Sequence, residues 1–251
     1  ASAVVITAAV ASSIGGLVGE AVAASDATDK FKKTLDFAKV DPSSIDALTK
    51  STRAYADATV YDLADIQNTT AQLASNGIKG YAELTEAAGN LNAVAGGNAE
   101  TFKSVGMVLT QTAGQGKLTT ENWNQLADAI PGASGALQEA LSQAGAYTGN
   151  FRDAMAEGQI TAEEFNAALM QLGTDPVAVE AAKSTATLEG ALGNLNATIV
   201  GGLSDAITAI KPGLTVLING FSELLGWVFQ FIGGLTGGMD LSVFAELLSY
   251  F

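Results

Sequence analysis

Cysteine and histidine are both absent from the 251 residues of the chain. Without cysteine there is no disulfide, no thiol nucleophile and no thiolate metal site. Without histidine there is no imidazole base, and the usual zinc and non-haem iron sites are excluded. Charged residues make up 15% of the chain, against about 25% in typical domains. We therefore expect no catalytic residue, no metal site and no cofactor.

Positive charge is scarce as well. The chain has 12 Lys and Arg against 26 Asp and Glu, which gives a formal net charge of −14. The one basic cluster lies within 30–39, and between residues 104 and 182 the only bases are Lys117 and Arg152. Because nucleic-acid affinity depends on cations that neutralise phosphates, we expect no specific binding of nucleic acid.

Small residues dominate what is present. The chain has 45 alanines and 28 glycines, and its length fits one large or two modest domains. It begins with Ala1 rather than Met, and both ends fall within hydrophobic segments. We therefore expect the sequence to be a piece of a longer protein.

Three compositional zones follow one another along the chain. They are an apolar N-terminal helix over 1–24, a polar helical domain over 25–186, and a hydrophobic, glycine-punctuated helical segment over 187–251. The first zone carries no charge before Glu20, and its length approaches the roughly 20 residues of a membrane span. It is interpreted either as a helix packed against protein or as a membrane-inserting segment.

Contact residues can be proposed in both apolar zones. Val10, Ile14 and Leu17 recur at the 4-3 spacing of a helix seam. Near the other end, the run from Leu214 to Leu235 has Glu223 as its single charge and is long enough to cross a bilayer. Glycines interrupt this run, so burial against protein is equally compatible with it. Its expected membrane or oligomer contacts are Phe221, Leu225, Trp227, Phe229 and Phe231.

Short helices bounded by glycine and proline are the pattern of the middle zone. Asp41-Pro42 is typical of a helix start, and Asn98 is a good cap for a later helix. Thr59 is expected to cap the helix that Asn76-Gly77 ends. Alternation of period two is confined to residues 3–7. We therefore predict an all-α fold of multiple short helices with hydrophobic terminal helices.

One nine-residue pattern occurs twice, as GKLTTENWN at 116–124 and as GQITAEEFN at 158–166. In each copy a glycine ends one helix, a threonine caps the next, and an acid lies in its first turn, where the helix dipole favours it. These capping residues are Thr119 and Glu121 in the first copy, and Thr161 and Glu164 in the second. The pattern indicates a structural device and names no function by itself.

The order of several segments carries a resemblance. Residues 116–141 (GKLTTENWNQLADAIPGASGALQEAL), 156–169 (AEGQITAEEFNAAL) and 187–203 (TLEGALGNLNATIVGGL), with the upstream stretch 62–109, resemble the tape measure domain of tail proteins from long-tailed bacteriophages. In that family a short helix after Ile-Pro-Gly and a Gly-x-Ile-Thr-x-Glu-Glu-Phe element occur in this order. The resemblance covers roughly residues 10–205.

The resemblance implies a structural, non-enzymatic virion protein inside the tail tube or tail tip. Its length would set tail length during assembly, with tail assembly chaperones bound. At infection it would leave ahead of the DNA, and its hydrophobic segments would help the genome across the host envelope, with the host membrane as a partner. The resemblance also implies a homo-oligomer, a trimer first and a hexamer as the alternative, in contact with tail tube and tail-tip proteins.

Two other classes remain open at this point. A pore-forming toxin or secretion translocator shares acidic, cysteine-free, Ala/Gly-rich helices, and Pro212-Gly213 between apolar stretches suits a membrane-inserting helical hairpin. A plain structural oligomer without a membrane role is the other alternative.

Overall fold

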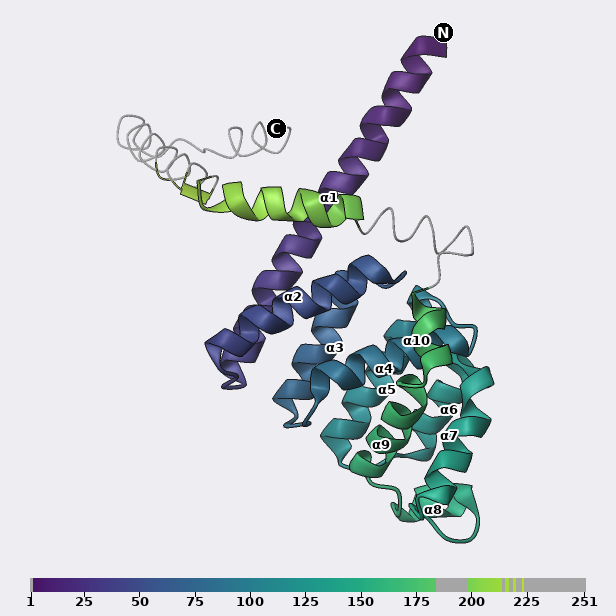
Figure 1. The fold of residues 1–251 in the computed structure, drawn as a ribbon. Coiled ribbons are helices and arrows are strands. Elements are labelled where there is room, and N and C mark those ends of the chain that lie inside the picture. Colours follow the sequence, from purple (N-terminus) through teal and green to yellow (C-terminus); the bar gives the residue numbers. More distant parts are fainter. Residues whose placement is uncertain (1, 184–197, 214, 217–218, 220–222, 224–251) are drawn as a thin grey trace, which may run out of the picture. The chain divides into compact units, whose positions relative to one another are not determined.

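The computed structural model describes residues 2–183 and 198–213, together with residues 215, 216, 219 and 223. Within these residues every regular element is a helix, which confirms the all-α prediction (Figure 1). The labelled helices are α1 (Ser2–Phe37), α2 (Pro42–Ala58), α3 (Leu63–Ser75), α4 (Tyr81–Val94), α5 (Ala99–Gln115), α6 (Thr120–Ala129), α7 (Pro131–Gln143), α8 (Phe151–Glu157), α9 (Ala162–Gly173) and α10 (Pro176–Ala182).

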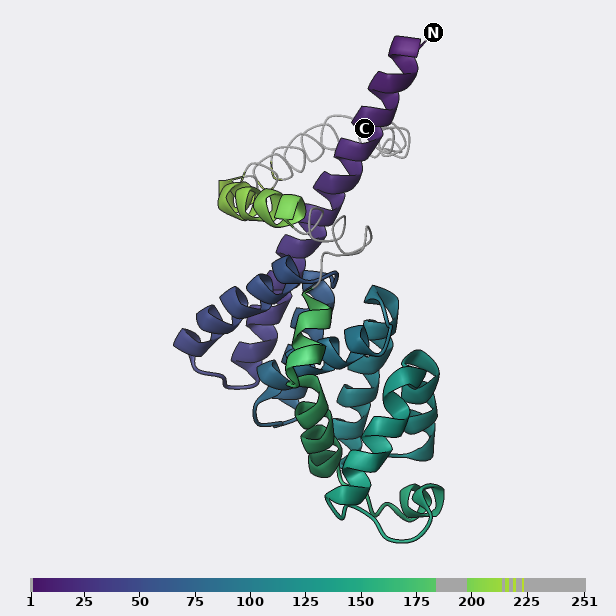
Figure 2. The same ribbon diagram turned by 45° about the vertical axis from the view of Figure 1, so that its right-hand side comes forward.

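Two compact units make up the chain, Ala1–Asp205 and Ala206–Phe251. The first contains α1 to α10. A further helix covers 198–213. In the first unit the N-terminal half of α1 extends beyond α2 and α3 in both views (Figure 2).

Side-chain caps define most of the helix starts. The carboxylates of Asp41 and Asp175 accept from the N–H groups of Ser43 and Val177, each at a helix whose first residue is proline. Asn98 forms a capping box at the start of α5. A cap of this kind stabilises a helix by about 1 kcal/mol, so the polar residues between the apolar stretches fix where the helices begin.

The cap assigned to Thr59 was wrong. This residue is the C-cap of α2, and its hydroxyl donates to the carbonyl of Tyr55 at 2.8 Å. The next helix, α3, starts only after Asp62. Between them Tyr61 turns into the core, where 2% of it is exposed. Burying this aromatic side chain requires an extended connection, which delays the helix start by three residues relative to the local capping signal.

Helix α4 is the centre of the first unit. It packs against α3, α5, α9 and α10, and its Leu84, Ala87, Ala88 and Leu91 are all buried. The closest approach is made by Gly173 at the end of α9. A Cβ atom there would overlap the carbonyl group of Ala87. Glycine at position 173 therefore allows two helix backbones to touch.

Polar side chains also run through this core. Tyr61 donates to the carbonyl of Gly89 at 2.7 Å and accepts from the amide of Asn92 at 3.0 Å. Tyr55 donates to Oδ1 of Asn90 at 3.0 Å, and the amide of Asn90 donates to the carbonyl of Gly173 at 3.0 Å. These bonds connect α2, α4 and α9 with the α2–α3 connection, and each satisfies a group that is costly to bury unpaired.

The two tyrosines predict a loss of stability at alkaline pH. Burial raises the pKa of Tyr61 to about 12, and it raises the pKa of Tyr55 still further. Unfolded tyrosine titrates near pH 10. Above that pH the unfolded chain releases protons that the folded state retains, so stability is complete below about pH 10 and declines as the pH rises toward 12.

Urea unfolding at several pH values measures this effect. Tyr61→Phe is expected to lower stability by about 1–2 kcal/mol at pH 8, because Asn92 and the Gly89 carbonyl lose a partner. The same variant should lose less stability than the wild type between pH 10 and 12. If the stability of the two proteins fell in parallel between pH 10 and 12, Tyr61 would not contribute to the alkaline loss of stability.

Candidate functional site

The two copies of the repeated pattern lie together in the structure. Lys117 and Thr161 form an isolated antiparallel bridge. The N–H of Leu118 donates to the carbonyl of Ile160 at 3.0 Å, and the N–H of Ala162 donates to the carbonyl of Gly116 at 3.0 Å. Segments 42 positions apart in sequence are thus paired directly across their helix starts.

Each copy caps its own helix. The hydroxyl of Thr119 accepts from the N–H of Asn122 at 3.2 Å, and Glu121 lies in the first turn of α6. Thr161 accepts from the N–H of Glu164 at 3.2 Å, while the Glu164 carboxylate accepts from the Thr161 N–H at 2.8 Å. The second copy is therefore a full capping box, and the first lacks the return bond.

Apolar side chains from both copies form the core beneath this pair. Leu118, Ile160 and Phe165 are fully buried, and Trp123 is 6% exposed. The ring of Trp123 meets Phe151 edge-on, with their centroids 4.6 Å apart. The paired copies therefore hold α6, α8 and α9 together, which is a structural role.

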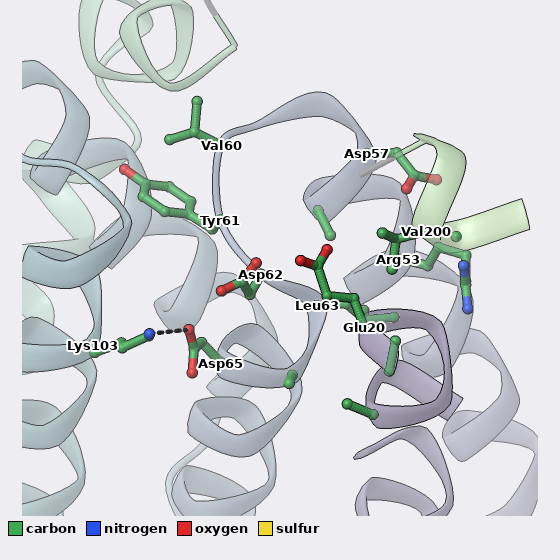
Figure 3. Close-up of a pocket in the computed structure, with 15 residues that line it drawn as sticks. Glu20, Arg53, Asp57, Val60, Tyr61, Asp62, Leu63, Asp65, Lys103 and Val200 are labelled. Carbon is green, nitrogen blue, oxygen red and sulfur yellow. Dashed lines mark ion pairs between the residues drawn. The ribbon is translucent and has the colours of Figure 1, made fainter. Parts of the chain in front are cut away.

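A pocket of about 380 Å³ lies at the other end of the unit, between α1, α2, α3, α5 and residues 200–201 (Figure 3). Its charged residues are the acids Glu20, Asp57, Asp62 and Asp65 and the bases Arg53 and Lys103. Lys103 is 3.7 Å from Asp65 and 2.9 Å from Glu100. Arg53 is 3.2 Å from Asp205.

Burial dominates the electrostatics of this pocket. It raises the pKa of the Asp65 carboxyl, and the nearby Lys103 ammonium offsets this only in part. Burial likewise raises the pKa of Asp57 against the opposing effect of Arg53. The hydrogen bond that the Lys103 ammonium donates to the Glu100 carboxylate raises the pKa of Lys103. Arg53 and Lys103 thus act as counter-ions that join helices distant in sequence.

The charged groups of this pocket are arranged as ion pairs between helices. Among the described residues no group of three or more acids is placed to hold a metal ion. The pocket's bases are engaged with carboxylates, as expected where ion pairs join helices. Sequence reasoning missed this pocket, because its residues come from separate helices and share no motif.

The predicted apolar contacts are placed only in part. Of Val10 and Ile14 the structure describes the helical backbone of α1, and Leu17 is half-buried. The residues that continue their spacing, Ala21, Ala24, Phe31 and Leu35, are buried within the first unit. Phe221, Leu225, Trp227, Phe229 and Phe231 lie outside the described residues. In the described part of the chain, no helix combines the length and apolar character that crossing a bilayer requires.

Comparison with known proteins gives a consistent result. A family model described as tape measure protein matches residues 19–219. The probable tape measure proteins of Lactococcus phages p2 and SK1 are each 26% identical over 225 residues. The match covers 87% of this chain and 22% of each relative, so the chain spans about a fifth of their length. No solved structure matches.

The family model covers most of the chain, and it matches the helices that form the core and the paired repeats. The chain belongs to the tape measure protein family, a family of structural proteins of phage tails.

Proposed function

We propose that this chain is a folded region of a tape measure protein that sets tail length during assembly and leaves the virion ahead of the genome at infection. The match over residues 19–219 is the observation that carries the proposal. The relatives are several times longer than this chain, which leaves room for an extended part beside a folded one. No step of this function requires catalysis.

The folded unit itself is poorly suited to setting tail length. An α-helix gains about 1.5 Å per residue along its axis, but α2 to α10 are 7 to 17 residues long and fold back on one another. Residues added to this unit would therefore add little length. Its proposed role is to organise the assembly by joining copies and by contacting tail tube proteins, tail-tip proteins and assembly chaperones.

Helix α1 is the proposed element that joins copies. Its C-terminal half packs on α2 and α3, with Ala21, Ala24, Phe31 and Leu35 buried, whereas its N-terminal half extends beyond α2 and α3. Val10, Ile14 and Leu17 continue the same 4-3 spacing into that half. A homo-oligomer, most simply a trimer, would bury this seam as a coiled coil does.

Delivery of the genome is assigned to the hydrophobic run 214–235. The double change Trp227→Asp and Phe231→Asp places two charges four residues apart in this run. If the run enters the host membrane, each charge near the bilayer centre costs about 2.5–3.5 kcal/mol. Phages carrying the change should have tails of normal length, seen by electron microscopy, but should fail to deliver DNA.

The double change Ile199→Asp and Ile210→Asp is the matched control, since these side chains are 40% and 61% exposed and both lie before the run. It adds the same charge and should leave infection intact. Full infectivity of the Trp227 and Phe231 variant would end the membrane proposal. Loss of its tails would show instead that the run is needed for assembly.

A further inference from the structure

An apolar groove lies on the first unit, away from the pocket of Figure 3. It has a volume of about 380 Å³ and lies between the ends of α4 and α9 and the starts of α7 and α10. Its floor and rims include Val94, Ala95, Gly132, Ala136, Val177 and Ala178. Val94 is 42% and Val177 is 66% exposed. Small residues between two exposed valines make a recess for one large side chain, since about 150 Å³ holds a benzene ring.

The helices that form the groove carry a net negative charge, and Lys183 is the base at the C-cap of α10. Helices α4, α7, α9 and α10 contain no lysine or arginine. Asp175, the cap of α10, is the acid that lines the groove. Helices α7 and α10 also carry Glu139 and Glu180, whereas Glu83, Glu86, Glu163 and Glu164 lie in the first halves of α4 and α9. An occupant that combines an apolar side chain with lysine or arginine would therefore be attracted, and an acidic one repelled.

The chain itself presents a matching element. Phe37, in the last turn of α1, is 82% exposed. Among the described residues, the other exposed large apolar side chains are all aliphatic. Lys30 and Lys33 precede Phe37 by seven and four positions, so all three lie on one face of α1, opposite the buried Phe31 and Leu35. Lys39 follows directly.

The aromatic end of α1 and the groove cannot meet within one copy. Helix α1 packs on α2 and α3, whereas the groove is formed by α4, α7, α9 and α10. In both views the turn from α1 to α2 is separated from α7 and α10 (Figures 1 and 2).

We infer that Phe37 of one copy binds in the α4–α7–α10 groove of a second copy, with Lys30 and Lys33 facing its acidic surroundings. The contact joins two different surfaces, so it is heterologous and builds either a closed ring or an open row of copies. It goes beyond the proposed function and does not depend on it. A single aromatic anchor gives a weak contact that acts when other contacts hold the copies close together.

The absence of cysteine allows a direct test by cross-linking. One preparation of the full chain carries Asp36→Cys, beside the aromatic anchor, and a second, tagged preparation carries Gln171→Cys, at the groove. The matched control is Gln111→Cys, an exposed glutamine on α5 outside the groove. With a short bismaleimide, Asp36→Cys should link to Gln171→Cys at least about tenfold more than to Gln111→Cys.

Two further variants test whether the cross-linking depends on Phe37 binding in the groove rather than on chance proximity. Adding Phe37→Asp to the Asp36→Cys chain, or Ala136→Trp to the Gln171→Cys chain, should bring linking down to the control level. Equal linking to positions 171 and 111 would overturn the inference, as would linking that survives Phe37→Asp. Preferential linking of Asp36→Cys to itself would also overturn it, because it would show a symmetric contact.

Discussion

Replacing Phe165 with alanine is expected to lower the free energy of unfolding by about 3–5 kcal/mol. Its side chain is fully buried at the start of α9, beneath the bridge between the two copies of the repeated pattern. Removing the ring leaves a cavity in the closely packed core beneath the paired repeats. Urea denaturation followed by circular dichroism measures the change from the transition midpoint at constant slope.

Phe37→Ala is the matched control, because the same ring is removed from a residue that is 82% exposed. This variant should change the free energy of unfolding by no more than about 0.5 kcal/mol. Similar losses for the two variants would mean that the paired repeats are not the core of this unit. The control also shows whether Phe37 can be changed in the cross-linking experiment without unfolding the chain.

Gly173→Ala is expected to lower the free energy of unfolding by about 3 kcal/mol or more, although it adds only one methyl group. That methyl group would overlap the carbonyl group of Ala87, so α4 and α9 would have to separate. Their separation would also break the bond from the Asn90 amide to the Gly173 carbonyl. Urea unfolding gives the magnitude, and loss of cooperativity would show that α9 detaches.

Gly135→Ala makes the same change at an exposed position of α7 where a Cβ atom meets nothing within 4 Å. It should stabilise the chain by about 0.5–1 kcal/mol, because alanine is the better helix former. If both glycine variants were stabilising, the close contact of α4 with α9 would be refuted.

Local signals in the sequence predicted the helical fold well. Asp41, Asn98 and Thr161 cap helices as expected, because a cap is decided by residues within one turn of each other. The repeated pattern was also recognisable, since its glycine, threonine and acid positions are short-range. The prediction that Thr59 caps α3 was wrong because the burial of Tyr61, a tertiary effect, outweighed a good local cap.

Long-range features could not be predicted in this way. The two repeats do not indicate by themselves that the backbones of Lys117 and Thr161 pair, since that pairing depends on how the three helices between them pack. Arg53 and Lys103 are isolated bases in sequence, and only the fold brings them to the pocket carboxylates. The groove likewise consists of residues from four helices, none of which is unusual in its own segment.

Tail length in electron micrographs tests the central claim most directly. In-frame duplications and deletions are made in helical stretches of the same gene outside residues 1–251, and an insertion of equal size is made between Thr148 and Gly149, in the exposed turn before α8. The account predicts tails that change by about 1.5 Å per residue for the first set and unchanged tails for the insertion. Tails of constant length throughout would contradict the assignment of this protein as the tape measure.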